Sequence, residues 1–178
     1  CIRDSFIVEP TAERNYYTLV TSGMGAHRMN VPKELAEYKL ERAEIVVYLP
    51  ADWNISDHEE KNYWPLRWLK ILARLPLEED SWLGWGHSVP NGKPFAENTQ
   101  LSSVLLINPE NVEEGAAVCQ LPNGEEVNFY QMIPLYEEEV NFKIQNGAET
   151  LLGKMGEISA VVDIHRLNVC EGFGRPKE

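Results

Sequence analysis

The sequence feature that most constrains the fold is a run of tryptophan and leucine residues between Trp64 and Leu75. Apolar residues recur in this run every three or four positions, which is the spacing of one face of an α-helix. The residues that align along this face are Trp64, Trp68, Ile71 and Leu75. Further leucine and alanine residues widen the face into an apolar arc of more than half the circumference, and such a helix is buried on several sides. We therefore predict that Trp64–Leu75 is the central helix of a single core and that the aligned residues hold the fold.

Two prolines and three basic residues define the ends and the polar strip of this helix. Pro65 suits the first helical turn, where its missing N–H costs nothing. Pro76 is expected to end the helix, because it removes a donor and clashes with the preceding turn. The basic residues Arg67, Lys70 and Arg74 fill the remaining strip. Such a strip is usually the solvated side of a helix, and the alternative is that it faces a partner.

The length and charge of the chain narrow the classes of function. Its 178 residues fit one domain, which we place at residues 1–178, and its formal net charge is −12. An acidic surface repels nucleic acid and anionic membranes and attracts basic partners, although it also promotes solubility. No apolar run approaches the roughly 20 residues of a membrane span. We therefore expect a protein that binds neither nucleic acid nor membrane.

The three cysteines favour a cytoplasmic location. Cys1, Cys119 and Cys170 cannot all pair, and none lies in a CxxC or comparable metal-binding spacing. Cysteines of this kind are typical of the reduced thiols of cytoplasmic proteins.

Strand and helix signals are interspersed along the chain and predict an α+β fold. Runs of β-branched and aromatic residues predict strands, and the turn Pro122-Asn123-Gly124 predicts a hairpin between two of them. The predicted strands are Phe6–Val8, Tyr16–Thr21, Ala43–Leu49, Val104–Ile107, Ala116–Leu121, Val127–Ile133 and Ile158–Ile164. The predicted additional helices are Pro32–Lys39, Leu77–Ser81, Leu135–Gln145 and Glu149–Lys154. We predict a mixed, largely antiparallel β-sheet packed around the helix Trp64–Leu75 in a single compact domain.

The sequence lacks the motifs of common enzyme classes. It contains no P-loop, no G-x-S-x-G nucleophile elbow and no G-x-G-x-x-G dinucleotide motif. Its four histidines are scattered, and no pair has the i, i+4 spacing of a zinc helix. Asp163 and His165 would share a face of a predicted strand, as in an acid–base or metal pair, although a charge pair on a half-solvated strand is commoner. We predict no catalytic residue, no metal site and no cofactor.

Runs of acidic residues are more typical of solvated patches than of catalytic pairs. The runs are Asp57/Glu59/Glu60, Glu78/Glu79/Asp80, Glu113/Glu114 and Glu137/Glu138/Glu139. A catalytic pair needs two environments that push two pKa values apart, and loops or helix starts do not suggest them. We expect these runs to steer a basic partner toward the protein.

The segment Trp82–Val89 is the strongest candidate for a partner contact. It places two tryptophans, two glycines and a histidine before a predicted turn. Aromatic residues on a constrained loop can anchor a partner peptide. The alternative is that both tryptophans pack in the core at the end of the central helix. We select Trp85 and His87 as the first contact residues.

Taken together, the sequence landmarks resemble the suppressor of fused domain family over roughly Phe6 to Val169. Each landmark is weak alone, and their order and spacing carry the resemblance. The first ones are Tyr17-Thr18-Leu19-Val20-Thr21-Ser22-Gly23-Met24, Met29, Pro32, Ala43-Glu44-Ile45-Val46-Val47-Tyr48-Leu49-Pro50 and Trp53. The later ones are Trp64-Pro65, Leu69-Lys70, Leu72-Ala73-Arg74, Trp82-Leu83-Gly84, Gly86-His87-Ser88, Val127-Asn128-Phe129, Ile133-Pro134-Leu135-Tyr136 and Glu139.

The resemblance implies a non-enzymatic protein-binding module with a mixed α/β fold. The chain is similar to the compact bacterial members, which are proposed to be immunity proteins that neutralise secreted toxins. The partner implied is a protein, and most specifically a toxin domain, which is expected to be basic if the toxin is a nuclease. One alternative is an intracellular regulatory or scaffold protein that sequesters a partner or pairs through a strand edge. Another is a hydrolase that uses Asp163 and His165, or His87. A monomer is favoured over an oligomer.

The family landmarks also extend the set of candidate contacts. Two of them, Thr21-Ser22-Gly23-Met24 and Gly86-His87-Ser88, place polar residues and glycines where strands are expected to end, and their role could be structural or functional. The full set of predicted partner-binding residues is Trp85, His87, Ser88, Ser22, Met24 and Arg28.

Overall fold

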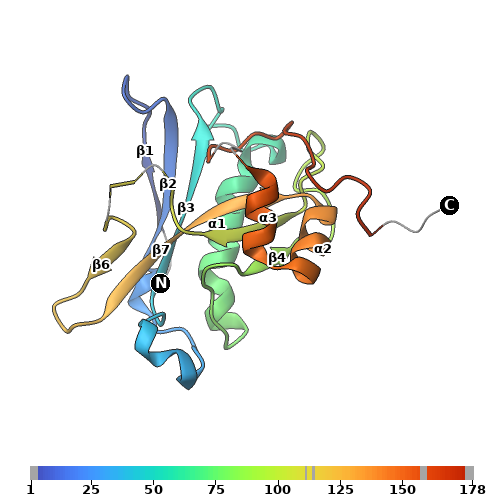
Figure 1. The fold of residues 1–178 in the computed structure, drawn as a ribbon. Helices are drawn as coiled ribbons and strands as arrows, with labels where there is room; N and C mark the ends of the chain where they lie inside the picture. Colours follow the sequence, from blue (N-terminus) through green and yellow to red (C-terminus); the bar gives the residue numbers. More distant parts are fainter. Residues whose placement is uncertain (1–3, 111, 114, 157–159, 175–178) are drawn as a thin grey trace.

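The protein is built on one seven-stranded sheet, and the computed structural model describes residues 4–110, 112–113, 115–156 and 160–174 (Figure 1). The strands are β1 (Asp4–Val8), β2 (Tyr16–Ser22), β3 (Ala43–Pro50), β4 (Ser88–Pro90), β5 (Ser103–Ile107), β6 (Val118–Gln120) and β7 (Glu126–Leu135). Their order is β1-β2-β3-β7-β5-β4, and β6 pairs with β7 outside this path. Every pair is antiparallel except β3 with β7. The predicted α+β fold with a mixed, largely antiparallel sheet is confirmed.

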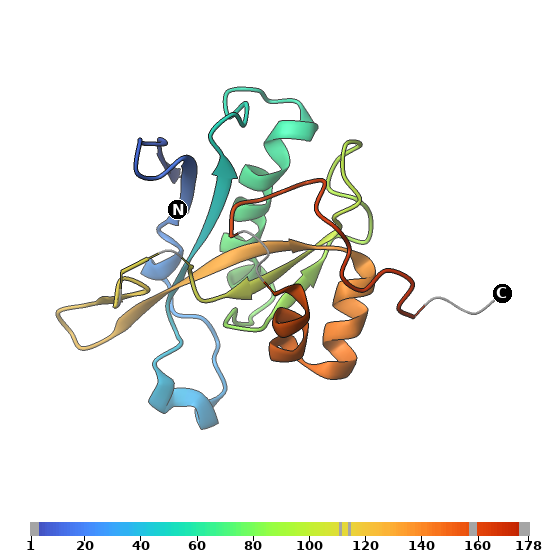
Figure 2. The same ribbon diagram turned by 45° about the horizontal axis from the view of Figure 1, so that its top comes forward.

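Helices cover both faces of the sheet (Figures 1 and 2). They are α1 (Glu60–Glu78), α2 (Glu137–Asn146), α3 (Ala148–Met155) and the 3₁₀ helices η1 (Met24–Ala26) and η2 (Lys33–Tyr38). On β5, Val104 and Leu106 pack in the core cluster around α1, whereas Leu105 and Ile107 pack in the cluster around α2 and α3. This alternation follows from the two-residue period of a strand. Among the described helices, none combines the length and the apolarity that a membrane crossing requires.

The central helix α1 is confirmed, but its buried face is rotated from the predicted one. Trp64, Trp68 and Leu72 are buried in the main core cluster, and Leu75 packs partly buried against it. Ile71 is 36% exposed, so the prediction that it holds the core is wrong. The apolar arc of the helix is wider than the surface that covers it, and Ile71 lies at the uncovered edge.

Both prolines lie inside α1, so the prediction that Pro76 ends the helix is wrong. Pro65 lacks the N–H that would bond to the carbonyl of Lys61 one turn earlier. The side-chain amide of Asn98 donates to that carbonyl instead, over 3.4 Å. Because most helical stability in proteins comes from packing an apolar face, the burial of Pro65 and Pro76 in the core outweighs the lost backbone bonds.

Four smaller elements differ from the prediction. The predicted helix Pro32–Lys39 is a 3₁₀ helix, and the predicted turn Leu77–Ser81 is present only as the end of α1. β4 was not predicted, because it is very short and contains a proline. In the predicted strand Ile158–Ile164, residues 158–159 lie outside the described residues. From residue 160 onward an isolated bridge between Val161 and Tyr48 takes the place of a strand.

Candidate partner-binding site

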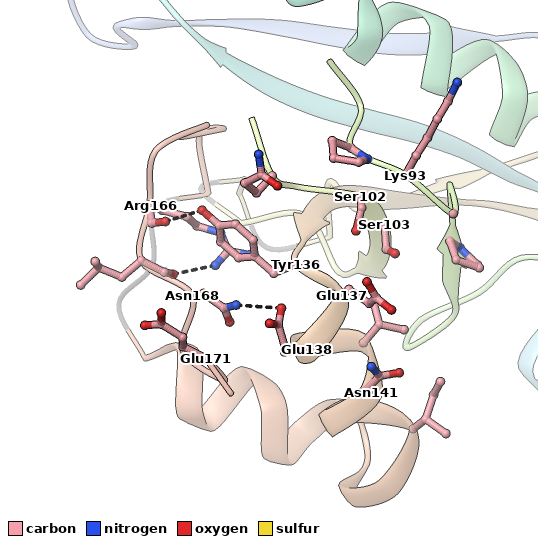
Figure 3. Close-up of a pocket in the computed structure, with 17 residues that line it drawn as sticks. Lys93, Ser102, Ser103, Tyr136, Glu137, Glu138, Asn141, Arg166, Asn168 and Glu171 are labelled. Atoms are coloured by element: carbon pink, nitrogen blue, oxygen red, sulfur yellow. Dashed lines mark hydrogen bonds between the residues drawn. The ribbon is translucent and has the colours of Figure 1, made fainter. Parts of the chain in front are cut away.

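A pocket of about 830 Å³ opens between the last strands of the sheet and α2 (Figure 3). Its walls are the loop that follows β4, the start of β5, the first turns of α2 and residues 166–171 of the C-terminal segment. Ser102 and Ser103 lie on one side of it, and Glu137 and Asn141 of α2 lie opposite. Its volume is in the range of pockets that bind ligands.

Two large apolar side chains line this pocket and are strongly exposed. Ile144 on α2 is 70% exposed, and Leu167 on the C-terminal segment is 85% exposed. A single exposed apolar residue is ordinary on a protein surface. Two of them on different walls of one pocket that also carries convergent polar groups are typical of a binding site.

The C-terminal wall of the pocket is fastened to α2 by a buried ion pair. Glu139 is completely buried and accepts hydrogen bonds from both terminal nitrogens of Arg166, at 2.6 and 2.5 Å. It also accepts from the backbone N–H groups of Tyr136 (3.0 Å) and Val169 (3.2 Å). The Tyr136 hydroxyl donates to the carbonyl of Arg166 over 2.6 Å. Moving this wall would leave a buried carboxylate unpaired, which is costly, so the pocket shape is held.

β4 forms the edge of the sheet beside the pocket. On the side that faces β5, the backbone N–H groups of Gly86 and Asn91 donate to the carbonyls of Leu106 and Ser102. The carbonyl of His87 accepts from the N–H of Leu106. Because backbone groups alternate in direction along a strand, those of Ser88 and Pro90 turn outward. Pro90 has no N–H. Among the described residues no further strand pairs with this edge, which therefore offers the donor and acceptor of Ser88 and the acceptor of Pro90.

The side chain of Ser88 is already engaged by α2. Lys143 Nζ donates to Ser88 Oγ over 3.2 Å. Burial lowers the pKa of Lys143. The backbone of Ser88, more than its hydroxyl, is therefore available to a partner.

The predicted contact residues Trp85 and His87 lie just before β4 and do not line the pocket. Trp85 is exposed. His87 is half-buried, and its ring packs edge-on against Trp82 with the ring centroids 4.3 Å apart. Burial lowers the pKa of His87, so its ring is mostly neutral at pH 7. Trp85 is the accessible residue of the pair, and His87 holds the loop through Trp82.

The turn after β2 is held by a buried carboxylate from β3. The hydroxyl of Thr21 donates to one oxygen of Glu44 over 2.5 Å. The backbone N–H groups of Gly23 and Gly25 donate to the other oxygen, both over 2.9 Å. A Cβ atom at Gly25 would lie only 2.9 Å from the side chain of Val127. The glycine-rich landmark is therefore a packed structural turn.

This turn separates the other predicted contacts from one another and from the pocket. Met24 is buried in the main core cluster, so its side chain offers almost no surface to a partner and we do not keep it among the proposed contacts. The turn that Glu44 holds directs the side chain of Met24 inward. Ser22 is half-buried, and Arg28 is exposed and pairs with Glu125 over 2.5 Å. None of the three lines the pocket, and β3, β7 and β5 lie between β2 and β4.

The alternative acid–base pair does not form. Asp163 accepts the backbone N–H of His165 over 2.8 Å, and both residues are exposed in a turn instead of sharing a strand face. Within the described ranges, no group of three or more histidine, cysteine, aspartate and glutamate side chains could hold a metal ion.

The pocket residues were missed by sequence reasoning, although one signal pointed to them. The run Glu137/Glu138/Glu139 was predicted as a solvated patch, whereas Glu139 is completely buried. Consecutive helical residues turn by about 100°, so Glu137 and Glu139 must point to nearly opposite sides of α2. At least one carboxylate therefore had to face the sheet and needed a cationic partner. Nothing in the sequence identified Arg166 as that partner.

Comparisons with known proteins agree with this architecture. A family model described as Suppressor of fused protein (SUFU) matches residues 3–167. An uncharacterized protein of Ureaplasma parvum serovar 3 is 28% identical over 155 residues, which cover 86% of this chain and 74% of that protein. A crystal structure described as a SUFU homologue from Neisseria gonorrhoeae FA 1090 has a TM-score of 0.65 at 20% identity, covering 93% of this chain and 76% of that chain.

Two further solved structures share the fold. The Sufu–Fu complex has a TM-score of 0.65 at 14% identity and covers 93% of this chain and 76% of that chain. Drosophila Suppressor of Fused has a TM-score of 0.64 at 15% identity and covers 93% of this chain and 42% of that chain.

The fold and the pocket define a mixed α+β domain with a ligand-sized hollow beside the edge of its sheet. The chain belongs to the suppressor of fused (SUFU) family, as its landmarks predicted.

Proposed function

We propose that this protein is a non-catalytic module that binds a segment of a protein partner in the pocket beside β4. The observation that carries the proposal is the combination on one surface of a free strand edge, a pocket of about 830 Å³ and the exposed side chains of Ile144 and Leu167. A free edge can bond to the backbone of an extended segment, and adjoining pockets can take its side chains. Trp85 and Ser88, before and at the start of β4, remain proposed contacts at the end of this surface.

Replacing an exposed side chain with alanine would have too small an effect on binding, so the test replaces it with a charged residue. The tagged protein would be recovered from its native host as the unmodified chain, as Ile144→Asp and as Leu77→Asp, and partners would be quantified by mass spectrometry. Leu77 is an exposed apolar residue on α1 and is the matched control. We expect one partner to be retained by the unmodified chain and by Leu77→Asp and to be lost from Ile144→Asp. Retention by Ile144→Asp, or the absence of any partner, would contradict the proposal.

The more specific form of this proposal is an immunity protein that neutralises a bacterial toxin domain. It is supported by the net charge of −12, which attracts a basic partner such as a nuclease. Electrostatic attraction raises association rates and is screened by salt. We expect the association rate with such a toxin to fall steeply between low and physiological ionic strength. A rate that does not change with salt would remove the electrostatic part of the proposal.

A regulatory scaffold is the second candidate, and the opposite edge of the sheet favours it. On β1, Phe6, Ile7 and Val8 are consecutive and all exposed. An exposed apolar edge strand can pair with another chain. A stable dimer in light scattering that Ile7→Lys converts to a monomer would support this candidate over the monomer that we favour. The cytoplasmic location stays a prediction.

A further inference from the structure

We propose that the pocket beside β4 selects a partner segment by a lysine or arginine side chain, which enters between α2 and the start of β5. This inference rests on the proposed binding function and adds the chemistry of the residue that is recognised. Two independent observations carry it: the exposed carboxylates of Glu137 and Glu171, and the hydroxyl groups of two nearly buried serines that line the pocket.

The charged groups that line the pocket are mostly acidic. They are Glu137, Glu138, Glu171, Lys93 and Arg166. Glu137 and Glu171 are exposed, and neither has an ion-pair partner in the part of the chain that the structure describes. Glu138 accepts a hydrogen bond from the amide of Asn168 over 3.0 Å.

The positive groups at the pocket do not cancel this acidity. Arg166 is committed to the buried Glu139, and Lys93 is exposed on the loop across the pocket. The N-terminus of α2 adds a partial positive charge of about half a unit, which is smaller than the charge of one carboxylate. A cation that enters the pocket therefore meets an excess of negative charge.

Two serine hydroxyls at the inner side of the pocket lack partners. Ser102 is 9% exposed and Ser103 is 3% exposed, and both line the pocket (Figure 3). Neither hydroxyl hydrogen-bonds to any residue within the described ranges. Both side chains are nearly buried yet line the pocket, so their hydroxyl groups are free to bond to a polar group that enters it. A serine hydroxyl can accept from an ammonium or guanidinium group.

The rim of the pocket suits the rest of such a residue. Lysine and arginine carry aliphatic stems that pack on apolar surfaces while their charged heads stay with polar groups. Ile144 and Leu167 supply strongly exposed apolar surface to the lining, Glu137 is an exposed carboxylate, and Ser102 and Ser103 are nearly buried. The arrangement therefore matches a long side chain with an apolar stem and a cationic end.

The test uses a random linear peptide library displayed on phage and selected on the full chain. We expect the selected peptides to share a lysine or arginine next to apolar residues. Replacing that residue by norleucine in a synthetic peptide should weaken binding about ten- to a hundredfold in fluorescence anisotropy, the effect of losing a charge-assisted hydrogen bond. The double variant Glu137→Gln with Glu171→Gln should lose the same factor and should bind both peptides equally.

The matched control is Glu78→Gln with Glu79→Gln, which removes the same charge from exposed positions at the end of α1 and should bind as the unmodified chain does. Selected peptides without a shared basic residue, or full affinity in the pocket variant, would overturn this inference and leave the proposed binding function standing. If no peptide were selected and Ile144→Asp kept every partner of the unmodified chain, both this inference and the proposed binding function would be rejected. Spermidine binding with the same dependence on Glu137 and Glu171 would also overturn it, by assigning the pocket to a small amine.

Discussion

Replacing Arg166 with methionine should destabilise the protein strongly, because the change leaves Glu139 buried without its cation. The carboxylate would lose two hydrogen bonds of 2.6 and 2.5 Å and keep those from the backbone of Tyr136 and Val169. Removing one partner of a buried ion pair costs about 3–5 kcal/mol. In a domain of this size each kcal/mol lowers Tm by about 2–4 °C, so Tm should fall by roughly 6–20 °C.

The free energy of unfolding would be measured by urea titration followed by tryptophan fluorescence. Arg67→Met is the control, because Arg67 pairs with Glu60 at the surface and such a pair contributes at most about 1 kcal/mol. Adding Glu139→Leu to Arg166→Met removes both charges and should recover part of the loss. If Arg166→Met were no less stable than the control, the ion pair would not fasten the C-terminal wall and our account of the pocket would be refuted.

Three further predictions concern the core, the turn after β2 and the loop before β4. Trp68→Ala should lower the free energy of unfolding by about 3–5 kcal/mol through cavity formation, whereas Ile71→Ala should lower it by less than about 1.5 kcal/mol. If urea unfolding showed similar losses for both variants, our assignment of the buried face of α1 would be wrong. Glu44→Ala should cost on the order of 2–4 kcal/mol because its donors lose their acceptor, and Glu44→Gln should cost less because it keeps one oxygen; equal shifts in thermal unfolding would contradict this role. Because burial lowers the pKa of His87 from its ordinary 6.5, the folded state binds fewer protons than the unfolded state, and stability should fall as the pH drops below about 6.5. His87→Asn should flatten the dependence of Tm on pH. If the variant kept the same dependence, other titratable groups would be its cause.

Most of the fold could be predicted because the main strands and α1 carry their signal locally. Apart from Glu44, the run Ala43–Leu49 is apolar, as expected for a strand that is buried on both faces, and β3 is buried along nearly its whole length. The rotation of α1 could not be predicted in the same way. Every apolar position on the arc is equivalent in sequence, and only the sheet decides whether Trp68 or Ile71 is covered.

The candidate site could be predicted far less well than the fold. Its walls come from segments that are distant in sequence, and tertiary packing alone brings Ser103, Glu137 and Leu167 to one hollow. Sequence reasoning located the edge strand through Ser88 without identifying it as a strand. It also selected Met24, because a glycine-rich turn of polar residues has the same composition whether it faces solvent or the core.

The parallel pair β3–β7 has a consequence for biosynthesis. Ala43–Val46 align with Asn128–Gln131. The half of the sheet that contains β1, β2 and β3 therefore joins the half that contains β7, β5 and β4 through residues that the ribosome synthesises at widely separated times. A nascent chain that has emerged through α1 exposes one long apolar margin of β3 until β7 follows it from the ribosome, and such a margin invites association with other chains. We expect amino-terminal fragments that stop before Glu126 to aggregate or to need a chaperone, even though they contain the whole of α1.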